Sequence, residues 1–207
     1  MCRAAAGIMD SDPGRKNDKV KLNHIVNHVP KSKLIPRCSV TDLLLELNPK
    51  PTLELFPGSQ VWTTAHHKIG FKHNVVHDWA NGMNPQYDMT NRDYVFGSLV
   101  PSLESGTYSC VHIATECTTF STMTGSTYRT CDEPLGTKEC LARGDAKATA
   151  CLAANEYGSN SVRAYLAADA GGSISSLENP KGSRFWSLPC AQVLLQRIKE
   201  GELDDSE

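Results

Sequence analysis

Hydrophobic residues in this chain form short runs separated by longer segments with helical spacing. Three of the runs, Thr52–Phe56, Phe71–His77 and Tyr108–Ile113, have the β-branched or alternating character of strands. A fourth run, Ser173–Leu177, follows the turn residues Gly171 and Gly172. Because strands and helical segments alternate along the chain, the pattern predicts an α/β fold with a doubly wound, mostly parallel sheet.

Helical spacing fills the intervals between the expected strands. Residues Gln60–Ile69 predict a helix between the first two strands. Thr137–Ala154 is rich in helix formers, with an interruption expected near Gly144, and Ser161–Ala170 predicts a second helix before the last strand. An amphipathic pattern over Pro189–Lys199 predicts a final helix.

The segments outside this pattern suggest one central domain with two appendages. We expect a flexible, basic leader over residues 1–38, an α/β domain over 39–200 and an acidic tail over 201–207. A capped helix is expected over residues 41–47. The segment 15–37 carries seven basic side chains against one acid, which fits either a phosphate-contacting arm or an ordinary solvated face.

Composition narrows the classes of protein. The formal net charge is −2, so no overall basic field favours nucleic acid. No run is long and apolar enough for a membrane span or a secretory signal, which predicts an intracellular protein of the cytoplasm or nucleus. The eight cysteines contain no C-x-x-C pair, and the histidines lack ligand spacing, so we expect reduced thiols and no metal.

Cys117 is the first candidate for chemistry. It follows the run Tyr108–Ile113 at the point where a strand of a parallel sheet delivers functional residues to a crevice. A single cysteine in this position is either an inert buried thiol or a nucleophile. The residues around Cys117 leave both interpretations open.

Three motifs in order extend the picture: an L-F-x-G turn ending at Gly58, a C-x-x-F-S motif starting at Cys117, and the pair Glu178-Asn179. Together they resemble the C5-cytosine DNA methyltransferases, which read F-x-G-x-G, P-C-x-x-F-S and E-N-V. The resemblance covers residues 52–186, roughly two thirds of the chain. The chain departs from the family at three positions, with other residues in place of a glycine, a proline and a valine: Gln60, Glu116 and Pro180.

The strand–turn–helix opening and the strand that follows predict a cofactor site. Glycine in such a turn lets the backbone approach a ligand, and an acid about 20 residues later commonly holds ribose hydroxyls, as Asp78 would. The alternative is a strand-ending Asp78 with Trp79 in the core. The resemblance implies that S-adenosylmethionine binds a set of residues that follow the first two strands: Phe56, Pro57, Gly58, Ser59, Asp78, Trp79, Asp88 and Met89.

The resemblance also implies a reaction and a partner. Cys117 would add to C6 of a cytosine in DNA, and the Glu178 carboxyl would stabilise the charge at N3. In the family, the loop after the cysteine closes over the extruded base, and Arg129 is the only positive charge in residues 122–136. The residues then expected at the substrate are Ser121, Arg129 and Asn179.

Two features keep other functions open. Glu116 places a carboxylate beside Cys117, which disfavours the thiolate. The chain ends at Glu207, short of the further strands and DNA-recognition region of such an enzyme. We therefore expect a minimal or truncated methyltransferase, or a catalytically inactive relative that binds S-adenosylmethionine or a partner. A third possibility is an unrelated nucleotide-binding α/β enzyme.

Overall fold

A computed structural model of the chain describes residues 50–58, 60–68, 71, 74–77 and 85–203, which all belong to the unit Leu45–Glu207. The expected leader over 1–38, the helix over 41–47 and the last residues of the acidic tail lie outside the described residues. Among the residues that are described, no helix is long and apolar enough to cross a membrane.

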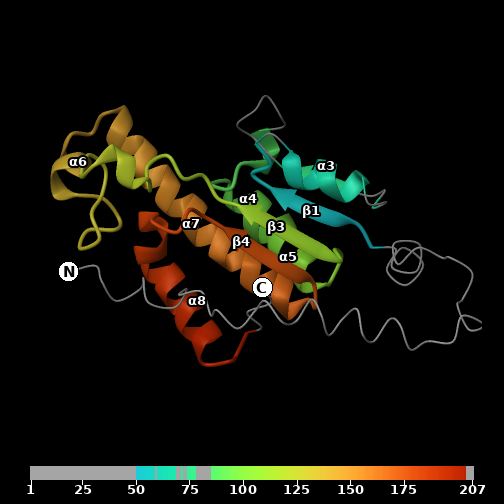
Figure 1. The fold of residues 1–207 in the computed structure, drawn as a ribbon. Helices are drawn as coiled ribbons and strands as arrows, with labels where there is room; N and C mark the ends of the chain where they lie inside the picture. Colours follow the sequence, from blue (N-terminus) through green and yellow to red (C-terminus); the bar gives the residue numbers. More distant parts are fainter. Residues whose placement is uncertain (1–49, 59, 69–70, 72–73, 78–84, 204–207) are drawn as a thin grey trace, which may run out of the picture. The chain divides into compact units, whose positions relative to one another are not determined.

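Four parallel strands form the sheet: β1 (Thr52–Leu55), β2 (Asn74–His77), β3 (Cys110–Ala114) and β4 (Ile174–Glu178). Their order is β2-β1-β3-β4 (Figure 1). The chain passes from β1 to β2 on one side and then returns across β1 to β3. The expected α/β architecture with a parallel sheet is therefore confirmed, and the sheet has a topological switch point between β1 and β3.

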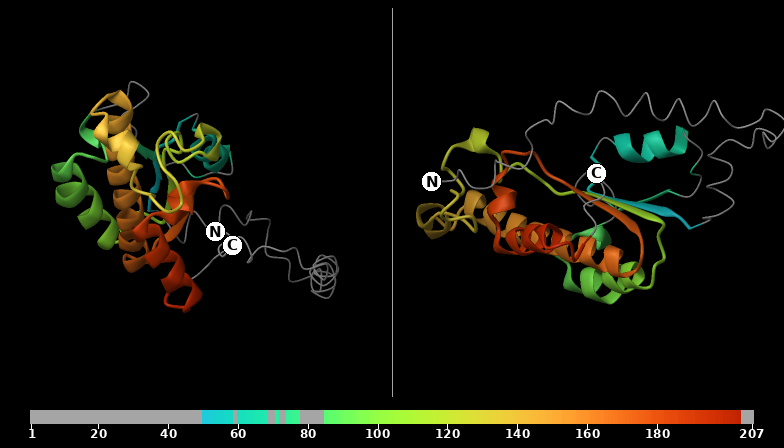
Figure 2. Two further views of the ribbon diagram at one scale, coloured as in Figure 1. Left: turned by 90° about the vertical axis from the view of Figure 1, so that its left-hand side faces the viewer. Right: turned by 60° about the horizontal axis from the view of Figure 1, so that its bottom comes forward.

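The helices divide between the two faces of the sheet (Figure 2). The helix α3 (Val61–Lys68), which joins β1 to β2, lies on one face. The opposite face carries α7 (Ala146–Ala170) and a continuous helical segment made of α4 (Arg92–Tyr94), a π-helical turn (Val95–Leu99) and α5 (Val100–Glu104).

Shorter elements complete the described chain. Single 3-10 turns occur at Pro85–Tyr87, Thr122–Thr124 and Arg184–Ser187. The short helix α6 spans Lys138–Ala142. The helix α8 spans Pro189–Lys199, as predicted from its amphipathic pattern. The helix α8 packs against α7.

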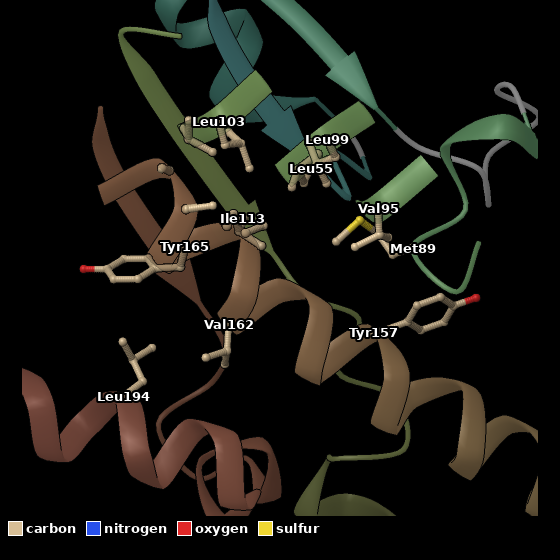
Figure 3. Packing of buried hydrophobic residues seen from close by; sticks show 14 of the residues in the cluster. Leu55, Met89, Val95, Leu99, Leu103, Ile113, Tyr157, Val162, Tyr165 and Leu194 are labelled. Carbon is tan, nitrogen blue, oxygen red and sulfur yellow. The ribbon is translucent and has the colours of Figure 1, made fainter. Parts of the chain in front are cut away.

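The core fills the space between the sheet and the helices α5 and α7 (Figure 3). Leu53 and Leu55 of β1 and Ile113 of β3 are buried there, on alternate positions of their strands. From the helices, Leu103 and Val162 belong to the same buried cluster. Burying a side chain of this kind contributes about 1.5–3 kcal/mol, so this face holds the sheet to its helices.

The helices differ from the predicted pattern at two places. The break expected near Gly144 is present, with φ +60° at that residue and a new N-cap at Asp145. The expected gap between Ala154 and Ser161 is absent, because α7 is one helix of 25 residues. The segment Arg92–Glu104 is helical although no helix was predicted there.

Candidate functional site

The turn after β1 forms one wall of the carboxyl edge of the sheet. Phe56, Gly58 and Gln60 have φ angles of +58°, +48° and +54°. Left-handed backbone is rare for residues other than glycine and costs about 1–3 kcal/mol where the surroundings impose it. Gly58 is exposed, and a Cβ added there would meet no atom within 4 Å. The turn therefore presents open backbone at Gly58.

Packing fixes this turn from both sides of the sheet. The Phe56 ring meets the Tyr157 ring edge-on at a centroid distance of 5.8 Å. On the opposite face, the buried Glu54 carboxylate accepts hydrogen bonds from the Thr63 backbone N–H (3.0 Å) and the Thr63 hydroxyl. Glu54 thereby anchors the first turns of α3, and with them the position of Gly58.

Aromatic rings make a second contact between α3 and the sheet. Trp62 lies between His66, at 3.7 Å between ring centroids, and His112, at 5.2 Å with the rings 10° from parallel. Partial burial lowers the pKa of His112, against the raising effects of Glu178 and Glu54. His112 is therefore a largely neutral partner in the stack near neutral pH.

The loop after β3 carries Cys117 at the surface. Its side chain is exposed, unlike those of Cys140 and Cys151, so Cys117 does not have the environment of an inert buried thiol. The neighbouring Glu116 uses its Oε1 to accept the Thr118 N–H at 2.7 Å. The carboxylate that departs from the methyltransferase motif thus stabilises the turn that presents the thiol.

The end of β4 brings Glu178 and Asn179 beside this loop. Glu178 is level with Ala114 in the strand register, and its exposed Oε2 lies 3.6 Å from Nε2 of His112. Asn179 is buried and donates from Nδ2 to the Thr115 carbonyl at 3.0 Å. The hydrogen bond joins the ends of β3 and β4, so Asn179 lies at the same edge of the sheet as the loop that carries Cys117.

Two buried oxygens at this edge have no hydrogen-bond partner within the described part of the chain. They are Oγ1 of Thr115 and Oδ1 of Asn179. Buried polar atoms in native proteins are nearly always bonded to protein, water or ligand. The carboxyl edge therefore retains hydrogen-bonding capacity for a bound group or an ordered water.

The prediction that Arg129 contacts the substrate requires a correction. The Arg129 side chain has no exposed surface, and its guanidinium lies 4.0 Å from the Phe120 ring centroid. It donates hydrogen bonds to a ring of acceptors from three segments: the Thr119 carbonyl and hydroxyl, the Pro134 carbonyl, Oδ1 of Asn155, and the Cys151 carbonyl and Sγ. The substrate contact predicted for Arg129 conflicts with this burial, because its donors already hold the loop together.

Other predicted residues have local roles or lie outside the described chain. Met89 is 2% exposed and belongs to the core, which contradicts direct contact with a cofactor (Figure 3). Asp88 accepts the Thr90 N–H at 2.8 Å, and Ser121 caps the 3-10 turn by accepting the Met123 N–H at 3.2 Å. Ser59, Asp78 and Trp79 fall outside the described residues.

A pocket of about 500 Å³ under β2 was not predicted from the sequence. His77, the last residue of β2, lines it together with Tyr87, Tyr94 and Tyr108. These tyrosines belong to a 3-10 turn, to α4 and to the segment before β3, so only the fold brings them together. Among the residues that are described, no group of three or more His, Cys, Asp or Glu is placed to hold a metal ion.

Comparisons of the chain with protein-family models, with curated proteins and with solved structures found no match.

Proposed function

We propose that this domain binds S-adenosylmethionine at the carboxyl edge of the sheet and transfers its methyl group to C5 of cytosine in DNA. The observation that carries the proposal is the switch point between β1 and β3, where open α/β sheets bind their ligands. The exposed Gly58 turn follows one of these strands and the exposed Cys117 follows the other.

Cys117, after β3, and Glu178, at the end of β4, would have different roles in this reaction. The Cys117 thiolate would add to C6 of the base and so make C5 nucleophilic toward the methyl group that S-adenosylmethionine would supply, with S-adenosylhomocysteine as the leaving product. Loss of the C5 proton to a base and departure of the thiolate then restore the ring. A protonated Glu178 carboxyl would donate to N3 and stabilise the charge that develops there.

The strand order also favours a second candidate, a domain that binds a mononucleotide without methyl transfer. Dinucleotide-binding sheets carry a further strand outside strand 2, in the order 3-2-1-4-5-6. Among the described residues, the chain goes from β2 to β3 through helices, giving β2-β1-β3-β4. Flavodoxin-like sheets, which hold flavin mononucleotide at the same switch point, have the order 2-1-3-4-5.

Two measurements distinguish these functions. Isothermal titration with S-adenosylmethionine, and separately with flavin mononucleotide, identifies the ligand of the edge. A tritiated methyl-transfer assay on cytosine-containing DNA then tests the reaction. We expect binding of S-adenosylmethionine and transfer that Cys117→Ser abolishes while cofactor affinity stays within about threefold, since the thiol attacks the base and does not hold the cofactor.

A second exposed cysteine provides the matched control. Cys131 lies in the loop that follows and is also exposed, so Cys131→Ser should leave transfer unchanged. Binding of S-adenosylmethionine without any transfer would identify an inactive cofactor-binding domain. Preferential binding of flavin mononucleotide would replace the proposal by the second candidate.

A further inference from the structure

The pocket under β2 lies on the face of the sheet that carries α4 and α5. It is bounded by His77 at the end of β2, by Tyr87 of the 3-10 turn Pro85–Tyr87, by Tyr94 of α4, and by Tyr108 just before β3. Its volume of about 500 Å³ falls within the range of small-molecule sites. Asp93 stands in the same lining.

Aromatic rings form two inclined walls of this pocket. His77 stacks on Tyr87 with centroids 4.1 Å apart and planes 8° from parallel. Tyr94 is inclined at 59° to Tyr87, with a centroid distance of 5.6 Å, and its hydroxyl is 2.6 Å from Nδ1 of His77. This hydrogen bond fixes both rings in place, so the walls are formed before any ligand arrives.

The charge on the lining has one sign. Burial lowers the pKa of His77 to about 4 and raises the pKa values of Tyr94 and Tyr108, so the imidazole and these phenols are neutral at physiological pH. Among the described residues that line the pocket, the Asp93 carboxylate is then the one formal charge. The neighbouring Arg92 lies instead over the Phe96 ring, at 5.4 Å, and is not part of the lining.

We propose that this pocket binds a small organic cation, with a quaternary or methylated ammonium group against the tyrosine rings and Asp93 supplying the opposite charge. Ring faces attract cations through their quadrupole, and aromatic cages are the recurrent way in which proteins hold quaternary ammonium groups. A strongly hydrated inorganic cation would lose more hydration than the phenols return, so the rings favour an alkylated one.

The proposed methyl-transfer site and this pocket have different walls. The proposed crevice centres on the ends of β1 and β3, whereas the pocket is lined from the end of β2 and the helical segment; the two adjoin at His77, whose carbonyl accepts the Phe56 N–H at 3.2 Å. Titration of the pocket in the presence of saturating S-adenosylhomocysteine separates the two sites. Unchanged affinity for the cation supports a separate pocket, and loss of binding would show that the pocket is part of the cofactor crevice and overturn the proposal.

Choline and its neutral isostere 3,3-dimethylbutan-1-ol provide the probe pair for the full chain. The two molecules have nearly the same shape and differ by one charge, so their difference measures cation recognition rather than apolar burial. We expect choline to bind about tenfold more tightly in chemical-shift titrations. Equal affinity for both probes, or no binding of choline at millimolar concentration, would overturn the proposal. A peptide carrying trimethyl-lysine, tested in parallel, distinguishes a free metabolite from a modified side chain as the source of the ammonium group.

Variants assign the effect to the rings and the carboxylate. Tyr87→Leu should weaken choline binding about tenfold, while Tyr87→Phe, which keeps the ring face, should retain it.

Asp93→Asn should weaken the binding of choline and leave the binding of the neutral isostere unchanged. Glu104→Gln, an equal change of charge at an exposed position of α5 outside the lining, is the matched control. Because Asp93 is exposed, its substitution tests the proposal even if Tyr87→Leu impairs folding. Equal choline affinities for wild type, Asp93→Asn and Glu104→Gln would overturn the role of the carboxylate.

Discussion

At the scale of single residues, Arg129 shows how a side chain that suggests ligand binding can serve the fold instead. Its position in the loop after Cys117 led to the prediction of a substrate contact. The structure surrounds it with carbonyl oxygens, an amide oxygen and the Phe120 ring, and gives it no exposed surface. Burial lowers its pKa, but a guanidinium stays charged at any ordinary pH. The charge is therefore compensated by dipoles and by the ring face.

Arg129→Met should destabilise the domain by about 3–5 kcal/mol, because it leaves several buried acceptors without a donor. Urea unfolding followed by circular dichroism measures the change. Arg143→Met is the control: its ion pair with Asp145 at 3.0 Å is solvent-exposed, and such pairs contribute about 0–1 kcal/mol. A loss below about 1 kcal/mol for Arg129→Met would contradict a structural role.

At the scale of elements, α7 depends on small residues where other segments approach it closely. Gly158 faces the Leu188 and Phe185 side chains, and Gly171, just after the end of the helix, faces backbone atoms in the last turn of α5 and just after it. A Cβ at Gly171 would lie 2.0 Å from the Leu103 carbonyl oxygen and 3.0 Å from the Gly106 nitrogen. The two chain segments can approach each other only because Gly171 has no side chain.

Gly171→Ala should therefore destabilise the domain by about 2–3 kcal/mol, since backbone atoms cannot move aside as a side-chain end can. Gly182→Ala is a matched control, because a Cβ there meets nothing within 4 Å. Thermal unfolding of both variants gives the comparison. Equal melting temperatures for Gly171→Ala and Gly182→Ala would show that the ends of α5 and α7 separate without cost.

The same helix explains which elements the sequence could predict. Strands and α8 were recognisable because their apolar spacing matches the face that they bury. The continuity of α7 was not recognisable from the sequence, since Gly158 and Ser159 have low helix propensity. The helix is retained there by packing against Leu188 and Phe185. The segment Arg92–Glu104 was missed for a related reason. Its π-helical turn and Pro101 disturb the 3.6-residue period.

At the scale of the whole molecule, the sheet determines which predicted residues meet. Parallel strands end at one edge, so the sequence alone could place the loop that carries Cys117 at the same edge of the sheet as Glu178 and Asn179. It could not predict the pocket under β2, because His77, Tyr87 and their neighbours reach it from separate elements. Motifs that follow strands are thus predictable from order, whereas sites along helix faces depend on how the helices pack.

The global stability should report the buried state of His77 through its dependence on pH. The folded pKa is about 4 and the unfolded pKa about 6.5, so between these values the unfolded chain binds more protons than the folded one. The free energy of unfolding therefore falls as the pH decreases from about 6.5 to 4, and the full contribution is present above pH 6.5. Partial exposure limits this contribution to about 2 kcal/mol.

His77→Gln removes the titration while keeping a group that can bond to the Tyr94 hydroxyl. We expect its free energy of unfolding, measured with urea at pH 7 and pH 4.5, to decrease less on acidification than that of the wild type. His67→Gln, at an exposed position of α3, should retain the wild-type dependence. The lowered pKa of His112 acts in the same direction, so some dependence on pH should survive in His77→Gln. Identical pH dependence in wild type and His77→Gln would mean that His77 titrates alike in the folded and unfolded chains, and the neutral ring wall beneath β2 would lose its support.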